Sequence, residues 1–144
     1  MFDTQVDRAM IEIIEKKNKL NALDYNDEQY DRLEDELHKI EDEFLAKYGS
    51  ELEEVIADIH DEYCPDIDVL SPLSYIAREY NKVGENEIGS IYDVKANQGV
   101  TVDLDDFPDN ETKLALIPNP MRVVLNIDNQ QQEEIWSKEK SSWV

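Results

Sequence analysis

The stretch NDEQYDRLEDELHKIEDEFLAKYGS, residues 26–50, sets the helical character of the fold. Its apolar residues recur at alternating steps of three and four, which is the period of one face of an α-helix. These residues are Tyr30, Leu33, Leu37, Ile40 and Phe44. Asn26 or Asp27 can cap the first turn, and Gly49 stands where a left-handed residue commonly ends a helix. The stretch therefore predicts a helix over residues 27–48.

A second predicted helix precedes this one and covers residues 4–20, where apolar residues again recur at helical spacing. The connection between the two helices is short, so we expect them to lie antiparallel as a helical hairpin. Each helix of a hairpin buries only one apolar stripe. Surplus apolar residues such as Ile11 and Ile14 are therefore compatible with a homodimer formed through the two helices.

Two further helices are predicted after the hairpin. Ser50 and Glu53 have the spacing of a capping box, and the apolar period continues to the next proline, which predicts a helix over residues 51–63. Ser71, with a proline directly after it, predicts a short fourth helix that ends near Tyr80.

Beyond Gly84 the apolar period changes from helical to alternating, which indicates β-strands. Four predicted strands have the sequences IGSIYDV, GVTVDL, TKLALI and MRVVLNI, residues 88–94, 99–104, 112–117 and 121–127. Val100, Val102 and Leu104 alternate with polar residues, so one face of the sheet should be buried and the other hydrated. We expect a small, mostly antiparallel four-stranded sheet whose apolar face is covered by the helices.

These elements predict an α+β fold, in which an N-terminal antiparallel helical hairpin and two further helices pack on the sheet. The chain of 144 residues has the size of one domain, and 40% of its residues are apolar. We expect a single domain with a helical part over residues 1–80, a sheet over residues 85–128 and a tail over residues 129–144.

The charge of the chain limits its partners. Thirty-five acidic residues against fourteen basic ones give a formal net charge of −21. This charge argues against nucleic acids and anionic membranes, because both are bound through Lys and Arg. It attracts basic proteins through a long-range, salt-sensitive field. We therefore expect a basic protein partner, no nucleic acid and no membrane, and charge that serves solubility alone is the alternative.

Cysteine usage and the N-terminal sequence favour a cytoplasmic location. Cys64 is the only cysteine, so neither an intrachain disulfide nor a zinc site made of cysteines can form. No stretch has the composition of a secretion signal or of a membrane span, so we expect a soluble protein. The usage of Asn, Ile, Lys and Asp is typical of a bacterial protein.

Motifs of common enzymes do not occur in the sequence. Cys64 stands before a proline at a predicted helix end, where the helix dipole disfavours a thiolate. The chain contains neither a Gly-x-Ser-x-Gly turn nor a glycine-rich phosphate loop. We therefore assign no catalytic residue and no cofactor. The sequence favours a non-enzymatic role, although catalytic groups from distant positions can gather in a fold.

The segment Asp27–Glu41, DEQYDRLEDELHKIE, resembles a helical segment near the N-terminus of NAD-dependent DNA ligases. In that family, similar Asp, Tyr-Asp and Glu-Leu residues help to bind the nicotinamide end of NAD, so the resemblance implies a contact with NAD. The family's Lys-x-Asp-Gly motif does not occur in this chain. The same residues suit an acidic amphipathic helix, which is the interpretation that we adopt.

Candidate metal ligands lie in the loop between the second and third predicted strands. Their carboxylates are those of Asp103, Asp105, Asp109 and Glu111, and such hard oxygen ligands suit calcium. The loop lacks the central glycine and the final glutamate of the helix-loop-helix calcium site, and a solvated turn is the alternative. Asp35 and His38 also share a helix face, but His60 has no acid at the matching position.

Four residues are candidate contacts for a partner: Trp136, Trp143, Glu34 and Glu41. Tryptophan is enriched at interface hot spots and is rarely left in water. The two tryptophans of the polar tail therefore either dock on their own domain, as part of a short helix, or contact a partner. The two glutamates belong to the acidic surface of the hairpin.

Our leading hypothesis is a non-enzymatic protein-interaction module, of the inhibitor or immunity type, whose acidic helical surface masks a basic partner. The alternative is a protein that binds a small molecule or a metal, with or without catalysis, in a pocket between the helices and the sheet. Tyr75, Arg78, Tyr80 and Tyr92 are the polar-tipped residues that would line such a pocket.

Overall fold

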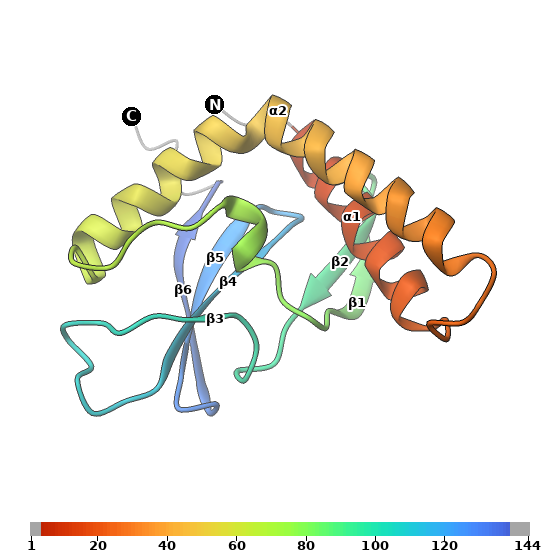
Figure 1. The fold of residues 1–144 in the computed structure, drawn as a ribbon. Coiled ribbons are helices and arrows are strands. Elements are labelled where there is room, and N and C mark those ends of the chain that lie inside the picture. Colours follow the sequence, from red (N-terminus) through yellow and green to blue (C-terminus); the bar gives the residue numbers. More distant parts are fainter. Residues whose placement is uncertain (1–3, 139–144) are drawn as a thin grey trace.

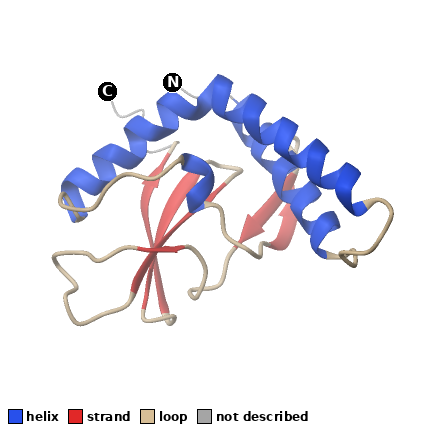
Figure 2. Cartoon of the chain, viewed as in Figure 1, coloured by secondary structure: helices blue, strands red, loops and turns tan. Residues whose placement is uncertain are grey.

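The structure, a computed structural model, describes residues 4–138. Within these residues, two α-helices and a short 3-10 helix are followed by six strands (Figure 2). The helices are α1 (Thr4–Asn21), α2 (Tyr30–Tyr63) and the 3-10 helix η1 (Pro72–Tyr75). The strands are β1 (Asn81–Glu85), β2 (Ser90–Asp93), β3 (Val100–Thr101), β4 (Thr112–Ile117), β5 (Arg122–Ile127) and β6 (Gln131–Ser137). The predicted α+β class is confirmed.

The strands form two antiparallel sheets instead of the one predicted. The larger sheet has the order β3-β4-β5-β6, whereas β1 and β2 pair only with each other among the described strands. The predicted strands TKLALI and MRVVLNI are confirmed as β4 and β5. The segment GVTVDL keeps only the two residues of β3 in regular pairing. The segment IGSIYDV leaves the main sheet because its hydrogen-bonded partner is NKVGE, residues 81–85, directly before it.

The last strand, β6, comes from the segment that we predicted to be a helical or loose tail. It pairs with β5 over its whole length, and Glu133 lies opposite Leu125. Its sequence QQEEIWS has no alternation of apolar residues, so the strand depends on backbone hydrogen bonds to an apolar neighbour rather than on its own side chains. The predicted helix is therefore wrong for residues 131–137, whereas the predicted docking on the domain itself is confirmed for Trp136, which packs against the core. Trp143 lies outside the described residues.

One continuous helix, α2, occupies the region where we predicted two. It runs from Tyr30 to Tyr63 through Gly49, so the predicted helices over residues 27–48 and 51–63 are segments of the same helix. Gly49 is buried in the interior of the helix, and its backbone is not left-handed. The predicted helix end at this glycine is therefore wrong.

The helix continues because its apolar stripe keeps its phase across the glycine. Phe44, Tyr48 and Leu52 follow one another at steps of four and face the core. Burying one large aliphatic side chain contributes about 1.5–3 kcal/mol, whereas a glycine in a helix costs about 1 kcal/mol. The four buried aliphatic residues beyond Gly49 together outweigh that cost: Leu52, Val55, Ile56 and Ile59.

The two halves of α2 have different neighbours. The N-terminal half lies antiparallel beside α1, which confirms the predicted hairpin, and the C-terminal half passes over the four-stranded sheet (Figure 1). Ile11 and Ile14 are 6% and 1% exposed, so these isoleucines belong to the core of their own chain. They offer no apolar surface to a second copy.

The predicted fourth helix is only the single turn η1. After Tyr75 the chain becomes extended, and Ile76 forms an isolated parallel bridge to Leu116 of β4. A part of β4 that does not pair with β3 thus binds the segment that would otherwise continue the helix.

Near η1, a buried histidine fixes the loop that follows α2. The Nδ1 atom of His60 lies 3.0 Å from the Ile67 carbonyl, which can only accept, so Nδ1 carries the proton. The Tyr75 hydroxyl then donates to Nε2 over 2.9 Å and accepts from the Leu70 backbone amide over 3.1 Å. All polar atoms of this side-chain pair are therefore occupied within the core.

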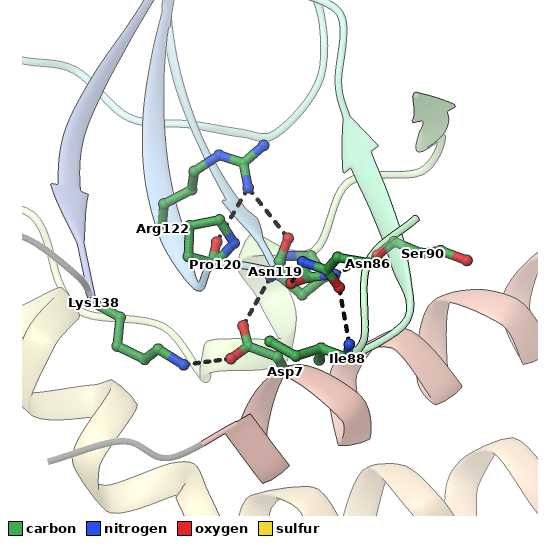
Figure 3. Close-up of polar contacts among 9 residues, drawn as sticks. Asp7, Asn86, Ile88, Ser90, Asn119, Pro120, Arg122 and Lys138 are labelled. Atoms are coloured by element: carbon green, nitrogen blue, oxygen red, sulfur yellow. Dashed lines mark hydrogen bonds and ion pairs between the residues drawn. The ribbon is translucent and has the colours of Figure 1, made fainter. Parts of the chain in front are cut away.

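A fully buried carboxylate, that of Asp7 in α1, joins distant parts of the chain (Figure 3). Its Oδ1 accepts the backbone amide of Asn119 over 2.8 Å, and its Oδ2 lies 2.5 Å from the Lys138 ammonium. Asn119 belongs to the turn between β4 and β5, and Lys138 directly follows β6. The carboxylate thus connects the first helix to a turn of the sheet and to its last strand.

The side chain of Asn119 extends this connection to the smaller sheet. Its amide pairs reciprocally with the amide of Asn86, at 2.9 and 3.0 Å, and it donates to the Ser90 carbonyl over 3.0 Å (Figure 3). Arg122 donates to the Pro118 and Pro120 carbonyls and closes the same turn. The two sheets and α1 therefore meet at one buried polar network.

Replacing Asp7 by alanine should lower the free energy of unfolding by about 3 kcal/mol, because it removes the carboxylate that accepts a buried amide and pairs with a largely buried ammonium. Urea unfolding followed by circular dichroism measures the change. The control is Glu12→Gln, an exposed acid of the same helix, which should stay within about 0.5 kcal/mol. Equal effects of the two substitutions would show that Asp7 contributes only charge.

Gly49→Ala should raise the free energy of unfolding by about 0.5–1 kcal/mol, the difference in helix propensity. A Cβ there would lie 3.6 Å from the Leu45 side chain, an ordinary contact. Gly99→Ala should destabilise instead, because Gly99 has φ +115° and its Cβ would lie 2.5 Å from the Leu114 carbonyl oxygen. A loss of stability in Gly49→Ala would mean that α2 breaks at that residue.

Candidate functional site

The surface of α2 carries a large part of the chain's negative charge. The helix contains thirteen acids and three Lys or Arg residues, and no basic residue other than His60 follows Lys47. Six exposed acids stand in this last part of the helix: Glu51, Glu53, Glu54, Asp58, Asp61 and Glu62. The last two lie in the final turn, where the helix dipole opposes negative charge. Acids at this end of the helix lower its stability, so their presence is not explained by a contribution to the stability of α2.

The end of α2 meets the loop between β3 and β4. The backbone amide of Asp105 donates to the carbonyl of Tyr63 over 3.2 Å, which holds the acidic loop against the last residue of the helix. The side chain of Tyr63 is half-buried against the core. An aromatic ring with a polar tip therefore stands where helix and loop join.

The negative charges of carboxylates from three elements act on this tyrosine. Burial raises the pKa of the Tyr63 hydroxyl, and the nearby charges of Glu62, Glu133 and Asp106 raise it further. Burial likewise raises the pKa of the Cys64 thiol, with a smaller contribution from Asp105. We call Glu62 of α2, Asp105 and Asp106 of the loop and Glu133 of β6, together with Tyr63, the acidic patch. Within residues 4–138, none of these four carboxylates forms an ion pair.

A hollow of about 450 Å³ opens in the loop beside the acidic patch. Its lining includes Asp103, Asp105 and the half-buried ring of Phe107. Carboxylates pair with guanidinium and ammonium groups, and an aromatic face attracts the same cations. The acidic patch and this hollow are thus suited to hold an arginine or lysine side chain.

The acids predicted as calcium ligands are not gathered into one site. Asp103 and Asp105 line the hollow, whereas Glu111 pairs with Lys113 over 3.2 Å and its backbone bonds to Asp128. Asp109 is exposed in the loop between them. Over residues 4–138, no group of three or more His, Cys, Asp or Glu residues is arranged to hold a metal ion.

The two predicted glutamate contacts lie apart from the acidic patch. Glu34 and Glu41 are half-buried in the N-terminal half of α2, and Glu41 is about 30 Å from Glu62 along the helix axis. Trp136 is half-buried against the core opposite Val123, and Trp143 is among the residues that the structure does not describe. The sequence predicted an acidic helix surface, but it did not predict that acids of the β3–β4 loop and of β6 would lie near Tyr63.

The tyrosines predicted to line a pocket are structural. Tyr75, Tyr80 and Tyr92 are buried, and the Tyr80 hydroxyl donates to the Leu116 carbonyl over 2.6 Å. Burial strongly raises the pKa of Tyr80. Of the four residues named for that pocket, Arg78 alone is exposed.

Comparison of the chain with protein-family models, with curated protein sequences and with solved structures found no match. The assignment of a function therefore depends on the described residues themselves. Over residues 4–138, no helix combines the length and the apolar composition that a membrane crossing requires.

Neutralising three acids of the acidic patch should lower the pKa of Tyr63 toward its usual value of 10.0, because each negative charge disfavours the phenolate. The variant is Glu62→Gln with Asp106→Asn and Glu133→Gln, and the readout is an NMR titration of the Tyr63 ring carbons. The matched control neutralises three exposed acids at the far end of α2, Asp31, Asp35 and Asp42. An unchanged Tyr63 pKa in the first variant would contradict the arrangement described here.

Proposed function

We propose that this protein is an interaction module that binds a basic segment of a partner protein at the acidic patch. The observation that carries the proposal is the convergence of acids from α2, the β3–β4 loop and β6 around Tyr63, without a neutralising cation among the described residues. Like charges brought together cost folding free energy, and a cationic partner would recover it.

The neighbouring hollow supplies the second element of recognition. An arginine of the partner would place its guanidinium between Asp103 and Asp105 and stack against Phe107. The Tyr63 ring would add a partly apolar contact at the centre, as is common in interface hot spots. Acids along the rest of α2 would steer the partner during its approach.

A module of this kind acts by masking. By covering a basic surface that the partner uses elsewhere, it would serve as an inhibitor or an immunity-type protein, and we propose the bacterial cytoplasm as its location. Such a role needs no catalytic group in this chain. The role is also consistent with the burial of His60 and Cys64 in the core, where both ring nitrogens of His60 are hydrogen-bonded.

The experiment captures partners from an extract of the source cells on the immobilised protein and elutes them with a salt gradient. Binding should weaken as salt rises, because the contacts are charged and partly exposed. The triple variant of Glu62, Asp106 and Glu133 should weaken binding of the captured protein at least about tenfold, or about 1.4 kcal/mol.

The triple variant of Asp31, Asp35 and Asp42 is the control, since it removes the same amount of charge about 30 Å or more from the patch. It should change the dissociation constant by less than about threefold. Equal weakening by both variants would show attraction to total charge instead of a site. Binding that does not depend on salt would overturn the proposal.

A further inference from the structure

A second hollow, also of about 450 Å³, lies where residues 74–78, around the end of η1, meet residues 97–101, which lead into β3. It also reaches Lys113 of β4. We call it the basic pocket, because its ten lining residues include Arg78 and Lys113 and no acid.

The sign of this lining is unusual for the chain, in which 35 of 144 residues are acidic. The hollow between α1 and α2 contains Arg8 and Lys47 but also Glu12 and Glu43. The hollow beside the acidic patch is lined by aspartates. Of these three hollows, the basic pocket is the one whose lining contains cations and no acid.

Arg78 is the cation that is open to a ligand. Its side chain is exposed, and its guanidinium makes no hydrogen bond or ion pair within the described residues. Lys113 has a different role, since its ammonium donates to the Asn97 carbonyl over 3.1 Å and pairs with Glu111 over 3.2 Å. Lys113 thus holds one wall in place, while Arg78 supplies the positive charge that is not balanced.

The two walls are held in a fixed relation by Gln98. Its side-chain carbonyl accepts the backbone amides of Arg78 and Glu79, over 3.1 and 3.2 Å, and its own backbone carbonyl accepts from buried Asn126 over 2.7 Å. Gly99 allows this segment to approach β4, where a side chain would strike the Leu114 carbonyl. The pocket is therefore built by interactions within the chain and needs little ordering on binding.

The remaining lining indicates the class of ligand. Ile76 and Val100 offer apolar surface, and Ser74 and Thr101 offer hydroxyl groups. A volume of about 450 Å³ lies at the small end of ligand sites, which span about 300–1,000 Å³. These features suit a small organic molecule with a short apolar part.

The charge balance favours a single negative charge on that molecule. The charges of Lys113 and Glu111 cancel, which leaves Arg78 as the uncompensated charge of the lining, since Glu79 is next to it in sequence but does not line the pocket. A guanidinium pairs with a carboxylate through two parallel hydrogen bonds, whereas a phosphate dianion would add excess negative charge to a chain of net charge −21. We propose that the basic pocket binds a small organic carboxylate, with Arg78 at the carboxylate and Ile76 and Val100 against its apolar part.

The test uses N-acetyl-L-leucine as the probe and follows NMR shifts of the Arg78 side-chain N–H and of the Gly99 and Thr101 amides. We expect saturable shifts with a dissociation constant of about 1 mM, because a probe with few non-hydrogen atoms makes few contacts. N-acetyl-L-leucinamide, which lacks the charge, and inorganic phosphate should each bind at least about tenfold more weakly.

Arg78→Gln should weaken binding of the probe at least about tenfold. The control is Arg32→Gln, which changes an exposed arginine far from the pocket in sequence, on α2, and should not affect binding. Both arginines are exposed, so both variants should fold, and their spectra away from the changed residue check this. Absence of saturable shifts, or equal binding by Arg78→Gln, would overturn the proposal. Phosphate that binds as tightly as N-acetyl-L-leucine would overturn the assignment to carboxylates.

Discussion

The buried carboxylate of Asp7 determines how α1 and the two sheets meet. A charge without water is costly unless it is paired and hydrogen-bonded, and here the Lys138 ammonium and the Asn119 amide satisfy it. These partners come from the end of β6 and from the turn between β4 and β5, so they favour the observed position of α1 over others. Asn119 also bonds to Asn86, in the loop between β1 and β2, and to Ser90 of β2, which connects the smaller sheet to the same site. The geometry of the two sheets relative to α1 thus follows from satisfying one side chain.

Residue periodicity predicted those parts of the fold in which the burial of apolar side chains contributes most of the stability. α1, β4 and β5 each bury an apolar face, and their bounds agree closely with the sequence pattern. Gly49 was misread because glycine is compatible both with a helix end and with a helix interior. The apolar phase that continues through Leu52 was the stronger signal, since it reflects several side chains instead of one backbone preference.

The elements that the sequence did not predict are those fixed by partners far along the chain. β6 is polar, and it becomes a strand because β5 offers it a row of backbone groups. The helix predicted up to Tyr80 stops early because Ile76 pairs with β4. The acids of the β3–β4 loop were recognised in the sequence, but their association with Tyr63 and Glu133 requires the folded arrangement. The basic pocket was equally hidden, because a net charge describes the whole chain and not the local sign around Arg78.

The contact between Asp7 and Lys138 spans 131 positions of the chain, which has a consequence for biosynthesis. A ribosome adds about 5–20 residues per second, so the lysine emerges on the order of ten seconds after the aspartate. Until then the native ammonium partner is absent, so burying the carboxylate at its final position costs several kcal/mol. We therefore expect α1 to reach its buried position only after the central strands have been made. Completion of the native core is a late event, which takes place after almost all of the described chain has left the ribosome.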